Sequence, residues 1–201
     1  MKSESIVFAV AGMCFGVILG WVLASQQSSR SAAAIAGAPA PAAAAAPQAQ
    51  SPPPLDEARV AQLKATIGSD PGNAGAHAQL GNLYFDAQRF PDAIAAYEQS
   101  LKINPNDPDV STDLGVSYYY TNRPDDALAQ FDRSLKVDPA HTKTLLNKGI
   151  VLAFGKEDLR AAADEWKKVV ELAPDSAEGQ AARRALEGVA AAHAAGNTTN
   201  Q

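Results

Sequence analysis

The chain of 201 residues has a single cysteine and only three histidines. Cys14 lies in an apolar stretch, and one cysteine cannot form an intramolecular disulfide. His77, His141 and His193 are far apart, without the spacing to Cys, Asp or Glu that metal sites use. Glycine-rich phosphate loops and nucleophile motifs are also missing. The sequence therefore predicts a protein that is not an enzyme and has no metal, no cofactor and no catalytic residue.

Basic residues are also few, with 17 Lys and Arg against 22 Asp and Glu, which gives a net charge of -5. A protein that binds nucleic acid needs a basic stripe to neutralise phosphates. No such stripe is present in the sequence, so nucleic acid is excluded as a partner. Acidic pairs such as Asp125-Asp126 are expected to be solvated helix faces.

The C-terminal two thirds of the chain contain an internal repeat. Pro71, Pro105, Pro139 and Pro174 divide it into steps of 34, 34 and 35 residues. Six positions, the proline among them, recur at a spacing of 34 residues: Leu80, Gly81, Tyr84, Ala93, Tyr97 and Pro105 match Leu114, Gly115, Tyr118, Ala127, Phe131 and Pro139. The third copy is looser: it keeps Gly149, Ala162 and Trp166 but has Lys148 in place of leucine, Leu152 in place of tyrosine and one extra residue around 155–158. A period of this length is typical of a stacked helical array.

Proline and small residues predict where the helices lie. We expect helix pairs at 74–87 with 90–103, 108–121 with 124–137, and 142–155 with 159–172, each pair ending before a proline. Gly81 and Gly115 lack a Cβ, so the second helix of the pair can approach closely. The large residues predicted to fill the core are Tyr84, Tyr97, Tyr118, Phe131 and Trp166.

The repeat resembles the tetratricopeptide repeat (TPR) family over roughly residues 73–175. The resemblance implies an all-α fold: a right-handed superhelix of three helix pairs, about 73–106, 107–140 and 141–175. Because an end repeat exposes an apolar face, capping helices are expected at 55–69 and 176–192 within a domain of residues 55–193. Ala181, Ala185, Leu186 and Val189 are expected to face inward on the last one. A disordered tail follows at 194–201. The family binds other proteins and performs no chemistry.

The first helix of each pair lines a concave groove in this family. Projecting the family's groove positions onto the chain gives an apolar and aromatic set: Ala78, Asn82, Phe85, Asp86, Thr112, Val116, Tyr119, Tyr120, Leu146, Ile150, Ala153 and Phe154. This set predicts a site for an apolar peptide or an amphipathic helix. Alternatively, the terminal cap helix or neighbouring side chains cover several of these residues. The basic clamp with which some members hold chaperone tails is absent, since Ala78, Thr112 and Leu146 stand where cations would be expected.

The N-terminal segment 1–25 is expected to be a membrane anchor. Ile6 to Ala24 contains no charged residue and is long enough to cross a bilayer. A cleaved signal peptide is the alternative. Lys2 favours a cytoplasmic N-terminus, which predicts a single-pass protein of the inner membrane with the repeats in the periplasm. The segment 26–54 is rich in Ala and Pro and is expected to be a disordered linker.

One face of the predicted anchor carries only small residues. Gly12, Gly16, Gly20 and Ala24 recur every four residues, and small residues let transmembrane helices approach closely. The anchor therefore self-associates, packs against another membrane protein, or is a monomer with incidental glycines.

The sequence predicts a membrane-tethered adaptor that binds a protein or peptide through its groove. The alternative is a structural subunit of an envelope assembly, such as cytochrome c maturation, secretion or pilus biogenesis. An anchor, a linker and about three repeats are similar to the periplasmic TPR components of cytochrome c biogenesis, which is a weaker resemblance than that to the TPR family.

Overall fold

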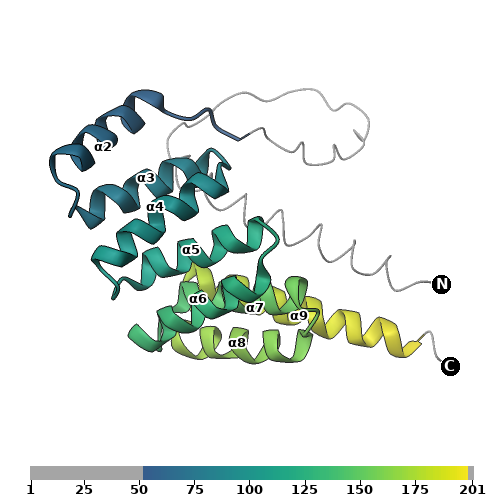
Figure 1. The fold of residues 1–201 in the computed structure, drawn as a ribbon. Coiled ribbons are helices and arrows are strands. Elements are labelled where there is room, and N and C mark those ends of the chain that lie inside the picture. Colours follow the sequence, from purple (N-terminus) through teal and green to yellow (C-terminus); the bar gives the residue numbers. More distant parts are fainter. Residues whose placement is uncertain (1–51, 199–201) are drawn as a thin grey trace, which may run out of the picture. The chain divides into compact units, whose positions relative to one another are not determined.

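The computed structural model describes residues 52–198 (Figure 1). This part of the chain is all-helical, with eight α-helices and no strand. The helices are α2 (Glu57–Ser69), α3 (Ala74–Asp86), α4 (Phe90–Ile103), α5 (Pro108–Tyr120), α6 (Pro124–Val137), α7 (Thr142–Gly155), α8 (Leu159–Leu172) and α9 (Ala177–Thr198). The six predicted helices of the three pairs agree with α3 to α8 within one residue at each end.

The turn inside each pair contains a residue in the left-handed region. Gln88, Asn122 and Glu157 have φ values of 56°, 60° and 57°. They occupy the same place in successive repeats, between the first and the second helix. None is glycine, so the sequence analysis did not anticipate a left-handed residue here. The conformation is costly for residues with a Cβ, and its recurrence indicates that it sets the direction of the second helix.

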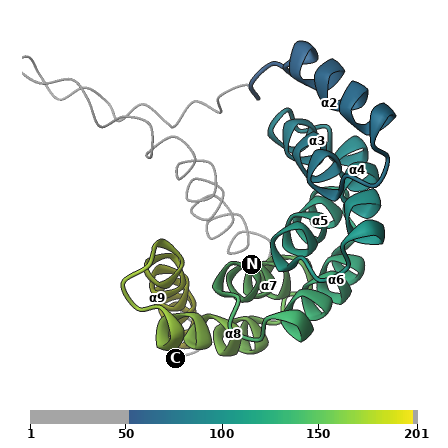
Figure 2. The same cartoon turned by 90° about the vertical axis from the view of Figure 1, so that its left-hand side faces the viewer.

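The helices form a curved stack in which neighbours along the chain are neighbours in space. Figure 2 shows α3, α5 and α7 on the inner side of the curve and α4, α6 and α8 on the outer side. The helices α2 and α9 lie at the two ends. The inner surface of the stack is therefore built from the first helices of the pairs.

Each pair is held by the contact of a glycine with a ring. A Cβ added to Gly81 would lie 2.5 Å from the Tyr97 ring, and one added to Gly115 would lie 2.5 Å from Cε1 of Phe131. In the third pair Gly149 lies against Trp166. All three rings are at most 2% exposed. The predicted close approach of the two helices is thus confirmed, and an aromatic side chain occupies the space that each glycine leaves.

Two positions of the repeat differ from the predicted packing. Tyr118 is half-buried rather than a core residue: its hydroxyl donates to Glu98 at 2.7 Å, and the guanidinium of Arg123 lies 4.3 Å from its ring centroid. Lys148, which replaces leucine, lies 2.9 Å from Asp132 and 3.1 Å from Glu165. The third copy therefore uses ion pairs to α6 and α8 where the other copies have an apolar contact.

Both ends of the array carry an arginine where the repeat requires a small residue. Arg59 on α2 occupies the place of Ala93, and Arg184 on α9 occupies the place of Gly149. Both arginines are exposed. Neither end can therefore bring a further helix as close as the helices inside each pair, and the stack stops.

The helix α9 differs in detail from the predicted cap. It runs to Thr198 rather than to 192, and so takes in part of the tail expected to be disordered at 194–201. Its Ala-rich sequence has high helix propensity. The fully buried residue is Ala182, which was not predicted, and the predicted Ala181 beside it is half-buried. The other three residues predicted to face inward, Ala185, Leu186 and Val189, do pack against the apolar cluster that includes Ala182.

The predicted anchor with its small-residue face, and the linker up to residue 51, lie outside the described residues. Across 52–198, no helix combines the length and the apolar character needed to cross a bilayer.

Gly115→Ala tests the glycine–ring contact. The added Cβ would overlap Phe131, so we expect the free energy of unfolding to fall by about 1–3 kcal/mol. Gly188→Ala on α9 is the matched control, because its Cβ meets nothing within 4 Å and the change should be neutral or stabilising by about 0.5–1 kcal/mol. Urea denaturation followed by circular dichroism measures both. Equal stability of the two variants would contradict the contact.

Candidate partner-binding groove

The inner surface of the stack carries the residues that the sequence analysis assigned to a groove. Asn82 and Asp86 on α3 are exposed. The half-buried members are Ala78, Phe85, Val116, Tyr119, Tyr120, Leu146, Ile150 and Phe154, while Ala153 and Thr112 are buried. The larger apolar and aromatic members are thus partly accessible, and the set does not form one uniformly open surface.

Four rings gather where α3 ends, α4 begins and α5 ends. We call Phe85, Phe90, Tyr119 and Tyr120 the aromatic cluster. Phe90 stacks on Tyr120 with ring centroids 4.6 Å apart, and Phe85 meets Phe90 and Tyr120 edge-on at 5.5 and 6.0 Å. Tyr119 and Tyr120 are 6.1 Å apart. All four are half-buried, so the cluster presents aromatic surface to solvent from three helices.

Phe90 was missed by the sequence analysis. It is the first residue of α4, an outer helix, and the projected groove positions lie only on the inner helices. The turn through Gln88 brings Phe90 back beside Phe85. A large aromatic residue directly before Pro91, at the start of a helix, was the available signal.

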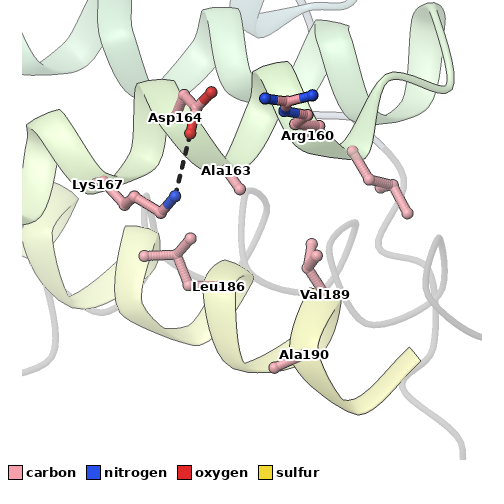
Figure 3. Close-up of a pocket in the computed structure, with 8 residues that line it drawn as sticks. Arg160, Ala163, Asp164, Lys167, Leu186, Val189 and Ala190 are labelled. Carbon is pink, nitrogen blue, oxygen red and sulfur yellow. Dashed lines mark hydrogen bonds and ion pairs between the residues drawn. The ribbon is translucent and has the colours of Figure 1, made fainter. Parts of the chain in front are cut away.

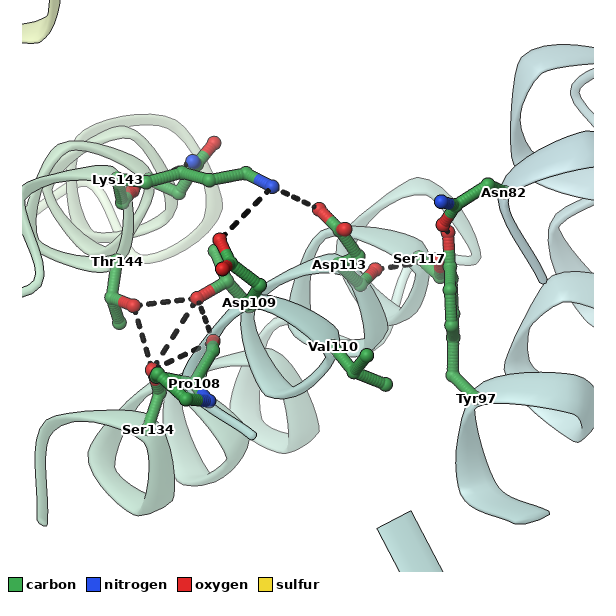
Figure 4. A network of polar contacts seen from close by, with 12 residues as sticks. Asn82, Tyr97, Pro108, Asp109, Val110, Asp113, Ser117, Ser134, Lys143 and Thr144 are labelled. Carbon is green, nitrogen blue, oxygen red and sulfur yellow. Dashed lines mark hydrogen bonds and ion pairs between the residues drawn. The ribbon is translucent and has the colours of Figure 1, made fainter. Parts of the chain in front are cut away.

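Thr112 does not line the groove, which corrects the prediction. It is fully buried, and its hydroxyl donates to the Pro108 carbonyl at 2.7 Å and lies 2.5 Å from Oγ1 of Thr144 (Figure 4). The Ser134 hydroxyl donates to the same carbonyl at 3.0 Å and lies 2.7 Å from Thr144. These hydroxyls join α5, α6 and α7, so Thr112 has a structural role.

The α7 part of the groove is less open than the rest. Leu146, Ile150 and Phe154 are half-buried and pack against the apolar cluster that includes Ala182 of α9. The end helix therefore shares the apolar surface of α7, as the alternative interpretation of the groove required. The accessible part of the groove is centred on α3 and α5.

Carboxylates border this part of the inner surface. Lys143 Nζ of α7 lies 2.7 Å from Asp113 and 4.0 Å from Asp109, both on α5 (Figure 4). Burial raises the pKa of Asp113 despite its pairing with Lys143. Burial also raises the pKa of Asp86. Tyr97, whose hydroxyl donates to Asn82 at 2.8 Å, has its pKa raised by burial and by the nearby carboxylates of Asp113 and Asp86.

A second hollow lies at the end of the stack, between α8 and α9 (Figure 3). It has a volume of about 590 Å³, with Leu159, Leu186 and Val189 among its apolar lining. Asp164 and Lys167 at its rim pair with each other at 3.0 Å. Among the residues that the structure describes, no group of His, Cys, Asp or Glu is arranged to hold a metal ion.

The helix pairs, their glycine–ring contacts and the curved inner surface define a helical repeat protein. The TPR repeat model matches residues 81–122, and a second tetratricopeptide repeat model matches residues 112–177. Residues 81–177 therefore consist of tetratricopeptide repeats. No curated protein matches the sequence significantly.

Solved structures with the same fold include TPR proteins. MamA is 14% identical, with a TM-score of 0.55, over 69% of this chain and 89% of its own. The first TPR domain of human RPAP3 is 23% identical, with a TM-score of 0.56, over 64% of this chain and 98% of its own. The first TPR of Spaghetti, solved with the HSP90 peptide SRMEEVD, is 23% identical, with a TM-score of 0.55, over 60% and 93% of the two chains. At these identities the likeness shows the fold.

Lys143→Met tests the electrostatics of the inner surface. The ammonium group is the main influence that lowers the pKa of Asp113, so its removal should raise that pKa further. A carboxyl group whose pKa is higher in the folded than in the unfolded protein lowers the free energy of unfolding as the pH rises from the unfolded to the folded pKa. The variant should therefore lose more stability than wild type over this pH range. Carbon-13 NMR of the carboxyl groups measures the pKa directly.

The matched control is Lys156→Met, which removes an ion pair to Asp125, a residue whose side chain is 81% exposed. It should leave the Asp113 titration unchanged. An identical Asp113 pKa in wild type and Lys143→Met would show that the ion pair does not form.

Proposed function

We propose that the chain is a membrane-tethered adaptor that binds a protein or peptide through its inner groove. The observation that carries the proposal is the aromatic cluster, whose four half-buried rings lie together at the ends of α3 and α5 and the start of α4. Aromatic residues dominate the binding energy of many protein interfaces, and contiguous apolar patches on soluble domains usually mark interaction sites. The proposed adaptor does no chemistry of its own.

The comparison with Spaghetti supports peptide binding as the mode. That TPR domain is solved with an HSP90 peptide of sequence SRMEEVD, which contains three acidic side chains. The chain described here has Ala78, Thr112 and Leu146 at the positions where the family's basic clamp would be expected. We therefore infer that the chain binds a peptide, and that this peptide is not an acidic chaperone tail.

We further propose that the N-terminal segment anchors the adaptor in the inner membrane, with the repeats in the periplasm. The support is the uncharged run from Ile6 to Ala24, followed by a linker whose composition cannot form a core. A proline-rich linker in the polyproline II conformation extends by about 3.1 Å per residue. Such a tether would hold the groove away from the bilayer while keeping it concentrated at the membrane surface.

A second candidate function is supported by the outer edge of the stack. Ile103, Val137 and Leu172 are 41%, 43% and 51% exposed and end the three outer helices in register. A permanent subunit of an envelope assembly, including one for cytochrome c maturation, secretion or pilus biogenesis, could cover this row. In that case the partner contacts would bypass the groove, and groove variants would still assemble.

Replacing Tyr119 and Tyr120 by alanine tests the groove. We expect partner binding to weaken by about 2 kcal/mol or more, in the range of interface hot spots, because the substitutions remove two rings of the aromatic cluster. The partner is cross-linked to the full chain in cells, identified by mass spectrometry, and its affinity is then measured with purified proteins.

The control is Ile103→Ala with Val137→Ala, which shortens exposed side chains on the outer edge. It should bind the partner as wild type does, and circular dichroism checks that both variants keep their helix content. If the folded tyrosine variant still binds the partner and the outer-edge variant does not, the result would favour the second candidate function, a structural subunit of an envelope assembly.

Gly16→Ile tests self-association of the proposed anchor. Isoleucine would separate two helices that pack through Gly12, Gly16, Gly20 and Ala24, so the association signal should fall. Residues 1–30 are fused to a reporter of transmembrane association, and wild type is compared with Gly16→Ile and with Val17→Ile, a change outside the small-residue face. If wild type gives no more signal than Gly16→Ile, the anchor does not self-associate, and packing against another membrane protein is the remaining possibility.

A further inference from the structure

The inner helices carry few charges, and their cations are already engaged. The charged residues of α3, α5 and α7 are Asp86, Asp109, Asp113, Lys143 and Lys148. Lys143 is paired with Asp113 at 2.7 Å. Lys148 is paired with Asp132 and Glu165, which belong to the outer helices α6 and α8. Neither lysine is therefore free to meet an anionic ligand in the groove.

Carboxylates, by contrast, remain available on the inner helices. Asp86 forms no hydrogen bond or ion pair with any residue in the described part of the chain, although burial raises its pKa. The Asp109 side chain is less free: it is 69% exposed, with Nε2 of His141 at 3.4 Å and, at 4.0 Å, the lysine that Asp113 holds more closely. A partly buried carboxylate without a cation is stabilised when a cation binds beside it.

The available carboxylates lie on the same side as the groove. Asp86 directly follows Phe85 of the aromatic cluster at the end of α3. Asp86 and Asp113 both act electrostatically on the hydroxyl of Tyr97, which hydrogen-bonds Asn82 of the groove. The accessible part of the groove therefore combines aromatic surface with negative charge from two neighbouring helices.

The same protein already pairs cations with rings elsewhere. The guanidinium groups of Arg89 and Arg123 lie 5.0 Å and 4.3 Å from the ring centroids of Tyr84 and Tyr118. Each arginine also pairs with a carboxylate, Asp92 or Asp126, at 2.7 Å. A cation held by a ring and a carboxylate is thus a stable arrangement in this fold. Phe85, Phe90 and Tyr120 with Asp86 offer both groups, and no cation of the described residues is placed over these three rings.

We propose that the groove selects a peptide segment in which a lysine or arginine stands next to aromatic or branched apolar residues. This inference rests on the proposed function of the groove and adds the chemistry of its ligand. The apolar residues pack on the aromatic cluster and Val116, and the cation binds Asp86. An acidic segment is rejected, because it would meet Asp86 while both lysines of the inner helices are already paired.

The test uses three fluorescent peptides with identical leucine and phenylalanine positions and with lysine, glutamine or glutamate at all other positions. Each is titrated into the full chain in a neutral detergent, and fluorescence anisotropy measures the affinity. The lysine peptide should bind about tenfold more tightly than the glutamine peptide, and the glutamate peptide should bind more weakly than either. Binding of a peptide to the detergent is the same for every protein variant, so it cancels when the affinities of two variants are compared.

Asp86→Lys should lower the affinity for the lysine peptide by about tenfold or more, leave the affinity for the glutamine peptide nearly unchanged and raise the affinity for the glutamate peptide. Asp86 is exposed, so the variant should fold. Glu171→Lys is the matched control. It makes the same change in net charge at an exposed residue of the outer helix α8, and should shift none of the three affinities by more than about twofold, since exposed charges at a distance are screened.

The outcomes separate this inference from the proposed function. If the three peptides bind equally, or if Glu171→Lys acts as strongly as Asp86→Lys, selection of a cation by the groove is wrong. If they bind equally but Phe85→Ala with Tyr120→Ala removes the binding, the groove function still stands. If no peptide binds, or if that double variant binds as wild type does, the groove function fails as well.

Two other occupants of the groove would also overturn the inference. A peptide of residues 25–51 that competes with the lysine peptide would identify the chain's own linker as the ligand. A dimer in light scattering that Tyr120→Ala converts to monomer would identify a second copy.

Discussion

The contact between a glycine on the first helix and a ring on the second is the interaction on which the rest of the fold depends. It recurs as Gly81 with Tyr97, Gly115 with Phe131 and Gly149 with Trp166. The glycine costs about 1 kcal/mol of helix propensity, whereas burial of the ring stabilises the pair by on the order of 3 kcal/mol. The balance favours close pairs, and close pairs stacked in one direction create a curved inner surface.

The sequence predicted the helices well because proline and glycine act locally. Proline ends a helix wherever it stands, so the bounds of α3 to α8 followed from the repeat. The groove was predicted less completely because accessibility depends on neighbours distant in sequence. Thr112 is buried by hydroxyls from α6 and α7, Leu146 is covered in part through α9, and Phe90 joins the aromatic cluster only because a non-glycine turn adopts positive φ.

The charged residues of the inner helices differ in whether they form ion pairs. Beside the inner helices, some cations form an ion pair nearby, as Arg89 before α4 does with Asp92 and Lys168 of α8 with Glu165. The two lysines of the inner helices are engaged, one of them with the outer helices. Pairing therefore engages both lysines of the inner helices, and the carboxylate of Asp86 is left at the inner surface without a cation among the described residues.

The buried hydroxyl cluster explains how such a surface can stay in place without a ligand. Thr112 and Ser134 both donate to the Pro108 carbonyl, and both lie within hydrogen-bonding distance of the Thr144 hydroxyl, which fixes α5, α6 and α7 in one register. A shift of any of these helices would leave a buried hydroxyl without a partner, at a cost of about 1–3 kcal/mol. The aromatic cluster and the carboxylates of α5 are therefore held by a rigid support. A peptide that binds there has to order itself but not the protein, and this lowers the entropic cost of binding.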